Sequence, residues 1–269
     1  MTTKRVRFLP LVKAYPTPSE RYGEAVCVAG ARLDVGEPHW MRLYPVLFRD
    51  LPDDQRFPKY ELVELDVLPH SDWRPESHRL MPESIRRLGH LDTNDAWRER
   101  RSIVEPMLIE SMCELARRSE LDKTSLGAFR PHEVTDVVAT REGGEWTDDQ
   151  LASLSRLSLF AQDRKPLRKV PWRFRYHYRC GGRCNGHQQS IIDWEVYETY
   201  FNARRGHSDN DAVALVRERW LDTLCGPDKD TIFFVGNQKE APKGFLVLGV
   251  FWPPSARPSK QMEHLDLGI

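Results

Sequence analysis

The sequence predicts an α+β protein, and three observations lead to this fold class. Short strand-like runs separated by proline and glycine follow one another through the first part of the chain. Helical spacing of apolar residues dominates later stretches. A run of cysteine and histidine indicates a metal knuckle. We therefore expect a β-rich barrel-like unit over residues 1–85, a mixed helical and strand segment over 86–160, and a C-terminal α/β part over 161–269 that holds the knuckle, two helices and a β-hairpin.

The first unit is expected to contain four strands. They are residues 6–12, 24–33, 40–43 and 60–68. Pro10 indicates an edge or a bulge in the first strand, and Gly30 indicates a bulge or a close backbone approach in the second. Short strands at this density suggest a small barrel, and OB-like and PUA-like barrels are the candidates by analogy.

The segment 70–79, HSDWRPESHR, follows the fourth strand and is almost entirely polar or charged. Its charged residues could form an ion-pair network or line a cleft. They are Asp72, Arg74, Glu76 and Arg79. Networks of this kind are common on protein surfaces, so the pattern leaves both possibilities open.

The middle of the chain is expected to be mostly helical. Apolar residues recur at helical spacing over residues 94–118, and Pro106 should kink or split this helix. Cys113 lies on the helix and is expected to belong to the core. The segment is completed by a turn at 123–129, a strand at 133–140 and a helix at 148–157 that Thr147 caps.

The C-terminal part is expected to contain a strand, two helices and a β-hairpin. The strand covers residues 172–179, the helices cover 190–204 and 211–225, and the hairpin strands cover 231–235 and 245–251. Ser190 and Asp193 resemble a capping box at the start of the first helix. Gly226 and Pro227 indicate the end of the second helix.

The most informative stretch is HYRCGGRCNGH, which places four potential metal ligands within eleven residues. They are His177, Cys180, Cys184 and His187. Thiolate and imidazole are the usual zinc ligands, and the separation of the two cysteines fits a zinc knuckle. The glycines between them let a short loop bend around an ion. We expect zinc, with an iron–sulfur cluster as the alternative.

The pattern leaves the fourth ligand open. Aromatic and basic side chains alternate through residues 172–179 as they do in a strand, which places His177 on a cationic face opposite Tyr176. The fourth ligand could then be Cys225, Cys27, Asp193 or a water. Three protein ligands with an open position would favour catalysis, and a closed site with four would favour a structural role.

Basic residues are concentrated next to the knuckle, although the formal net charge of the chain is zero. No acidic residue occurs from Arg164 to Arg183, and aromatic residues are interleaved with the basic ones. Cations together with aromatic faces are what single strands and unstacked bases require. The residues expected to contact nucleic acid are Arg173, Arg175, Tyr176, Arg179 and Arg183. The alternative is a solvated strand whose aromatic side chains point into the core.

Three functions are compatible with these patterns. The first is a nucleic-acid-binding protein with a zinc knuckle, for which single strands or RNA are better partners than a sequence-specific duplex. The second is a metal-dependent nuclease or other hydrolase, in which His187, Asp193 and Glu195 would activate water. The third is a non-catalytic interaction module whose zinc is structural. The common nucleotide-binding loops, the H-E-x-x-H zinc motif and the G-x-S-x-G turn are missing from the sequence.

The composition is that of a soluble globular protein of one large domain or two modest ones. No apolar run reaches the length of a membrane span. The first residues do not resemble a signal peptide, and five cysteines, an odd number, do not suggest a disulfide framework. We therefore expect a cytoplasmic protein without a membrane partner.

Overall fold

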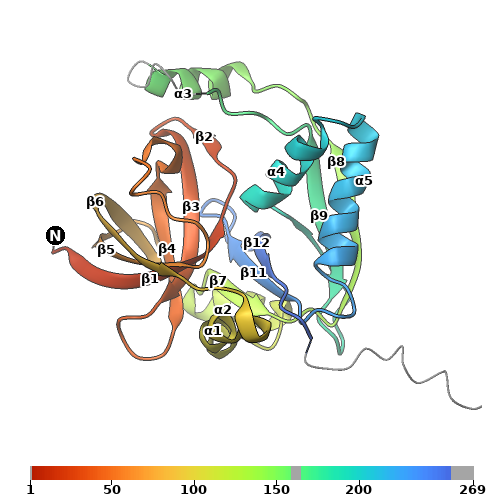
Figure 1. The fold of residues 1–269 in the computed structure, drawn as a ribbon, viewed down its shortest axis with the longest axis horizontal. Helices are drawn as coiled ribbons and strands as arrows, with labels where there is room; N and C mark the ends of the chain where they lie inside the picture. Colours follow the sequence, from red (N-terminus) through yellow and green to blue (C-terminus); the bar gives the residue numbers. More distant parts are fainter. Residues whose placement is uncertain (1, 159–164, 256–269) are drawn as a thin grey trace, which may run out of the picture.

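A computed structural model of the chain describes residues 2–158 and 165–255, and it confirms a mixed α+β architecture with a β-rich N-terminal region (Figure 1). The N-terminal strands are β1 (Lys4–Lys13), β2 (Thr17–Ser19), β3 (Gly23–Arg32), β4 (His39–Val46), β5 (Glu61–Pro69) and β6 (Ser77–His90). They form one sheet in the order β1-β5-β6-β4-β3-β2, and β1 also pairs with β3. The four strands expected from the sequence are all present.

Alternation of buried and exposed residues positions these strands. In β5 the side chains of Val63, Leu65 and Val67 are buried, and the residues between them are partly exposed. The register of β1 with β3 shifts after Pro10, as expected for a bulge. A Cβ atom at Gly30 would lie 2.0 Å from the backbone oxygen of Leu9, which confirms the close approach expected there.

Four strands were not expected from the sequence: β2, β6, β7 (Leu126–Phe129) and β10 (His187–Ser190). Two of them show why. Strand β6 carries few buried apolar side chains, so the polarity of residues 77–90 concealed it. The second is β7 (Leu126–Phe129), in the segment expected to be a turn because of Gly127. This glycine serves close packing instead, since a Cβ atom there would lie 2.9 Å from the Leu115 side chain.

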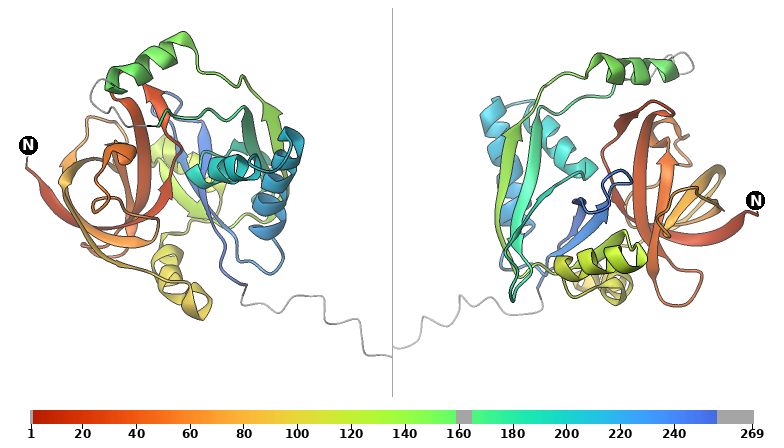
Figure 2. Two further views of the ribbon diagram at one scale, coloured as in Figure 1. Left: turned by 45° about the horizontal axis from the view of Figure 1, so that its top comes forward. Right: turned by 180° about the vertical axis from the view of Figure 1, so that it is seen from behind.

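The C-terminal part contains two further sheets. Strands β8 (Glu133–Arg141), β9 (Trp172–Arg179) and β10 (His187–Ser190) form one in the order β10-β9-β8. Strand β7 forms the other with β11 (Ile232–Asn237) and β12 (Phe245–Phe251), and the expected β11–β12 hairpin is confirmed. Figure 2 shows the β7–β11–β12 sheet between the N-terminal strands and β8–β9.

The helices begin and end at identifiable residues. Their bounds are α1 (Asn94–Val104), α2 (Met112–Asp122), α3 (Asp148–Ser158), α4 (Trp194–Ala203) and α5 (Asp209–Arg217), and α5 continues into a π-helical segment over Glu218–Thr223. The chain leaves the first helix at a 3₁₀ turn containing Pro106, so the expected split is confirmed. The expectation that Ser190 caps α4 is wrong, because Ser190 is paired in β10 and Asp193 is the cap.

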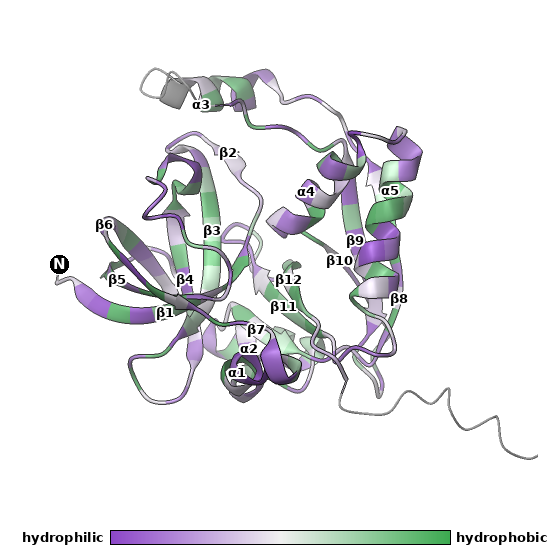
Figure 3. Ribbon diagram, viewed as in Figure 1, coloured by the Kyte–Doolittle hydropathy of each residue, from purple (hydrophilic) through white to green (hydrophobic). Residues whose placement is uncertain are grey.

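An apolar cluster joins the two parts of the chain. Leu9 from β1 and Phe234 and Phe251 from the central sheet are buried together, and the Trp40 ring meets Phe234 edge-on at 5.6 Å. Figure 3 shows hydrophobic colour along β11 and β12 in the middle of the molecule. Among the described residues no helix combines the length and apolar character needed to cross a membrane.

Candidate functional site

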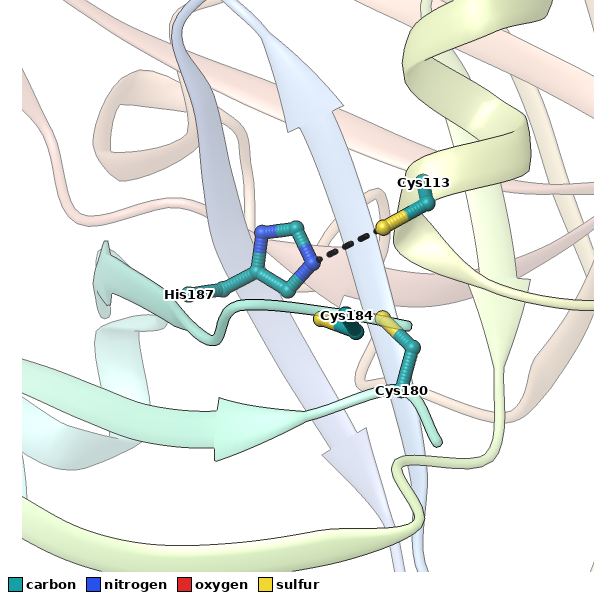
Figure 4. Close-up of side chains that lie close together, drawn as sticks. All are labelled: Cys113, Cys180, Cys184 and His187. Atoms are coloured by element: carbon teal, nitrogen blue, oxygen red, sulfur yellow. Dashed lines mark hydrogen bonds between the residues drawn. The ribbon is translucent and has the colours of Figure 1, made fainter. Parts of the chain in front are cut away.

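Four side chains from separate segments converge beside the β9–β10 turn (Figure 4). They are Cys113 at the start of α2, Cys180 after β9, Cys184 in the turn and His187 at the start of β10. Their ligand atoms all lie within 4.8 Å of one another. A Cys3His cluster able to hold a metal ion is therefore part of the fold.

The local sequence explains how these side chains reach one another. The turn between β9 and β10 has positive φ at Gly181, Gly182 and Gly186 (93°, 55° and 98°), a conformation that glycine adopts without strain. The His187 ring stacks on Tyr178, its partner across the β9–β10 ladder, with ring centroids 5.1 Å apart. Ser111 caps α2 by accepting a hydrogen bond from the backbone of Glu114, which fixes the first turn of the helix.

The distances suit a single tetrahedral ion. Zinc binds sulfur at about 2.3 Å and histidine nitrogen at about 2.0–2.1 Å, so a sulfur and a nitrogen on one tetrahedral ion are separated by roughly 3.6 Å. The Sγ atom of Cys113 lies 3.4 Å from Nε2 of His187. The two atoms are thus already at the separation that a shared ion requires.

Burial changes the pKa values of the groups in the cluster. Burial raises the pKa of the Cys180 thiol to about 12 and raises the pKa of Cys113. Burial opposes the ionisation of Cys184 as well, but backbone hydrogen bonds around its sulfur lower its pKa overall. Burial lowers the pKa of His187, which favours the neutral imidazole that binds metals. A cation among the sulfurs would stabilise the thiolates that burial alone disfavours.

The cluster corrects the ligand set expected from the sequence. Cys180, Cys184 and His187 belong to it, but the fourth member is Cys113 and not His177, Cys225, Cys27 or Asp193. Strand alternation explains the first difference: Tyr178 and His187 share one face of the sheet, and His177 lies on the other, opposite Gln188. Cys113 was expected to belong to the core, but it is exposed at the start of α2.

The basic–aromatic strand β9 is divided between surface and core. Tyr176 is fully buried, and its hydroxyl donates a hydrogen bond to the backbone oxygen of Trp220 at 2.7 Å, so the expectation that it contacts nucleic acid is wrong. The Phe174 and Tyr178 side chains are buried on the same face. On the other face, Arg173 pairs with Glu142 and Arg175 contacts Thr140.

The remaining basic residues of this stretch are exposed. Arg179 and Arg183 are exposed at the end of β9 and in the following turn. Arg164, the first residue of the basic stretch, lies outside the described residues. The outer face of β9 is therefore cationic, and the aromatic rings of the strand lie on its other face.

The three residues expected to form a hydrolytic site do not contact one set of partners. One belongs to the Cys3His cluster, and the other two pair with a lysine. His187 belongs to the Cys3His cluster, and the strand that follows rises about 3.3 Å per residue, which carries the chain roughly 10 Å away by Ser190. Both carboxylate oxygens of Asp193 accept hydrogen bonds from Lys59 at 2.8 and 2.7 Å, and Glu195 pairs with the same lysine at 3.1 Å.

Asp193 thus lies outside the Cys3His cluster and is held by contacts of its own. Its side chain is 1% exposed, and its Oδ1 atom also accepts the Glu195 backbone N–H as the cap of α4. Burial opposes the charge on Lys59, but Asp193 and Glu195 outweigh it and raise the pKa of the lysine. This cluster joins the N-terminal part to α4, since Lys59 precedes β5.

A cleft of about 1060 Å³ is lined by residues of both the N-terminal sheet and the C-terminal part. Seven basic residues line it, against four acidic ones among the described residues. The basic residues are Arg21, Arg42, Arg74, Arg79, Lys169, Arg173 and Lys239. The aromatic residues of its wall are Tyr15, Tyr22, Tyr44, Trp146, Trp172 and Tyr197. This cleft thus combines cations with aromatic rings, a combination that the outer face of β9 lacks.

Part of the floor of the cleft is a buried polar network. Asp72 accepts hydrogen bonds from Nε of Arg74 at 2.8 Å and from Ser77 at 3.1 Å. Arg42, 2% exposed, donates to the Ser125 hydroxyl at 2.8 Å, and that hydroxyl donates to Glu76 at 2.7 Å. The sequence left open whether segment 70–79 forms an ion-pair network or lines a cleft, and it does both. Asp72, Arg74 and Arg79 line the cleft, and Asp72 and Arg74 also form an ion pair.

Comparisons with known proteins match families that have no assigned function. One family model, DUF8758, matches residues 4–106, and another, DUF8757, matches residues 108–266; both are described as domains of unknown function. All four cluster residues lie in the second match, and the cleft is lined by both. No curated protein matches the chain. A solved structure titled as a murine DNA-binding protein bound with double-stranded DNA covers 96% of this chain and 98% of its own, at 11% identity and a TM-score of 0.30, too low to support a common fold.

Proposed function

This chain belongs to the DUF8757 family, a domain of unknown function, and we propose that it is a nucleic-acid-binding protein in which a zinc ion supports the structure. The observation that carries the proposal is the cleft, which combines an excess of basic residues with aromatic rings. Basic residues bind phosphates, and aromatic rings stack with unstacked bases.

Zinc is the ion that this ligand set favours. Cys3His is a common structural zinc set, and four protein ligands leave no open position for a reacting water. An iron–sulfur cluster, the alternative, is held by four cysteines or by two cysteines and two histidines in the usual cases. In this proposal Cys113, Cys180, Cys184 and His187 hold the zinc, which ties α2 to the β9–β10 turn.

Single strands and RNA are the preferred partners in this proposal. Bases can meet aromatic side chains in a cleft only when they are unstacked, as they are in single strands and loops. Arg173 connects the two basic surfaces, because it lines the cleft and begins the row of arginines on β9. A strand leaving the cleft could follow Arg175 and Arg179 along that row.

The type of N-terminal barrel and the cellular location are part of the same proposal. The N-terminal pairings return from β3 to β1, which supports a small barrel of the OB or PUA kind. The free cysteines of the cluster need a reducing compartment to remain available for metal, which supports a cytoplasmic location.

The proposal is tested by fluorescence anisotropy with labelled single-stranded DNA and RNA of mixed sequence, over a series of salt concentrations. Affinity should fall steeply with salt because counterions are released on binding. Arg173→Ala combined with Arg175→Ala should weaken binding to all sequences and reduce the salt slope by roughly 1.4, at about 0.7 per lost phosphate contact.

The matched control is Arg98→Ala combined with Arg205→Ala, which removes two exposed arginines that do not line the cleft. This control should bind like the unmodified protein. A protein that binds neither DNA nor RNA single strands at low salt would contradict the proposed function.

A further inference from the structure

One corner of the cleft is built where two distant loops are fastened together. The indole Nε1 of Trp73 donates to the backbone oxygen of Lys239 at 3.3 Å, and Nη1 of Arg74 donates to the backbone oxygen of Asn237 at 2.9 Å. Arg74 is buried and is itself held by Asp72. The tip of the β11–β12 hairpin is therefore fixed against segment 70–79, and Lys239 has a defined place at the edge of the cleft.

Two cations of this corner have no carboxylate partner among the residues that the structure describes. Arg79 and Lys239 are exposed, line the cleft and form no ion pair with the part of the chain that the structure describes. Arg74 and Arg173, by contrast, are paired with Asp72 and Glu142. Burial lowers the pKa of the nearby His70, and the charges of Lys239, Arg79 and Arg74 lower it further against the opposing charge of Asp72. Positive charge from segment 70–79 and from the β11–β12 tip thus converges around one ring.

Aromatic side chains line the same corner. The Tyr44 ring meets His70 edge-on at 6.2 Å and Tyr22 edge-on at 6.3 Å, and all three residues line the cleft. Tyr22 and Tyr44 are only partly buried, and the Arg21 guanidinium lies 5.2 Å from the centre of the Tyr22 ring. A flat heteroaromatic ring can stack on such a surface, with a contribution of about 1–3 kcal/mol per base.

We propose that this corner binds one nucleotide unit, with its phosphate between Arg79 and Lys239 and its base against Tyr44 and Tyr22. The inference rests on the proposed function, since it names the place in the cleft where a strand would be gripped. A nucleotide matches both features, because it carries an anionic phosphate and a planar ring a few ångströms apart. The same chemistry is offered by a free mononucleotide and by a unit within a strand.

Isothermal titration calorimetry with AMP, and with ribose 5-phosphate as a probe without the base, tests the corner itself. Arg79→Gln combined with Lys239→Gln should weaken AMP binding about a hundredfold or more, since two charge-assisted hydrogen bonds are lost and each contributes about 1.5–3 kcal/mol. Tyr44→Leu should weaken AMP binding about fivefold or more and leave ribose 5-phosphate unchanged, because only stacking is lost.

The control is Arg98→Gln combined with Arg205→Gln, which removes the same charge outside the cleft and should bind AMP like the unmodified protein. Metal content and thermal unfolding are measured for each variant. Should the double variant fail to fold, Lys239→Glu at the exposed hairpin tip replaces it and should reduce AMP binding in the same way.

Labelled single strands, measured with the same variants, separate this inference from the proposed function. If strands bind the unmodified protein but the corner variants lose neither AMP nor strand affinity, the corner assignment is overturned and the proposed function stands. If AMP binds and depends on the corner variants while no strand binds, the proposed function fails and the corner stands as a site for a free nucleotide.

Discussion

At the scale of single residues, the ligands of the Cys3His cluster come from two separate parts of the chain, the β9–β10 turn and helix α2. His187 is oriented by the Tyr178 ring and Cys184 by the backbone N–H of Gly186 at 3.3 Å, and both come from the turn that the sequence identifies. Cys113 comes from helix α2, 67 residues before Cys180 in the printed sequence. It is therefore the ligand that turns a local knuckle into a link between α2 and the sheet.

Cys113→Ser should abolish stoichiometric zinc binding, because the site loses one of its four ligands and the link to α2. Metal content measured by inductively coupled plasma mass spectrometry checks this. His177→Ala is the matched control: it should retain one zinc per chain, since its side chain lies on the other face of β9. Loss of zinc in the control with retention in Cys113→Ser would return the fourth position to His177.

Lys13 provides a second prediction at this scale. Its Nζ atom lies 3.9 Å from the centre of the Phe48 ring and donates to the backbone oxygen of Phe57. Burial, together with the charge of Lys59, lowers the pKa of Lys13 to about 7 from an ordinary 10.5. The unfolded chain therefore binds more protons than the folded chain between pH 7 and 10.5, so this group makes the protein more stable as pH rises through that window.

Lys13→Met should remove this pH dependence. The free energy of unfolding of the unmodified protein, measured by urea titration from pH 6 to 9.5, should rise relative to the variant above pH 7, by roughly 1.4 kcal/mol per pH unit at most. Parallel curves for the two proteins would show that Lys13 keeps its ordinary pKa in the folded state.

At the scale of elements, the cleft depends on the fastening of segment 70–79 to the β11–β12 tip. The side chain of Asp72 is 1% exposed and that of Arg74 is 8% exposed, so their ion pair is removed from water. Breaking a buried pair by removing one partner costs about 3–5 kcal/mol, because a charge is left buried without compensation.

Arg74→Ala should therefore lower the free energy of unfolding by about 3–5 kcal/mol, as measured by urea titration. Arg56→Ala is the control, because Arg56 pairs with Asp53 at the surface, where the aspartate is 93% exposed. That change should cost under about 1 kcal/mol. Equal effects of the two substitutions would mean that the Asp72–Arg74 pair does not stabilise the fold.

The elements also show what local sequence can predict. Strands with alternating apolar residues, the β11–β12 hairpin and the helix break at Pro106 follow from short-range rules, and the structure contains them. Strand β6 and the short strand β7 do not, since β6 is stabilised by its neighbours and β7 by burial. The fourth ligand and the cleft depend on contacts between residues far apart in the chain, for which one sequence carries no spacing signal.

At the scale of the whole molecule, the two family matches do not correspond to independent cores. Leu9, from the first matched region, shares a cluster with Phe234 and Phe251 from the second, and the backbone of Tyr15 donates to that of Ile192 at 2.8 Å. Residues from both regions line the cleft. A ligand bound there would therefore contact both, and we expect the chain to unfold as one cooperative unit.

Phe234→Ala tests this expectation. The side chain is 1% exposed, and its removal should lower the free energy of unfolding by about 3–5 kcal/mol through the cavity it leaves. Tryptophan fluorescence and near-ultraviolet circular dichroism should still report a single coincident transition, shifted to lower denaturant. Two separate transitions, with only one shifted, would indicate that the matched regions fold independently.

The most direct test of the metal centre on which this account depends is X-ray absorption spectroscopy at the zinc edge of the purified protein. The Cys3His cluster predicts three sulfur neighbours at about 2.3 Å and one nitrogen neighbour at about 2.0–2.1 Å around a single zinc ion. A first shell of oxygen neighbours, or purified protein that holds no zinc and unfolds at the same temperature after treatment with a chelator, would contradict it.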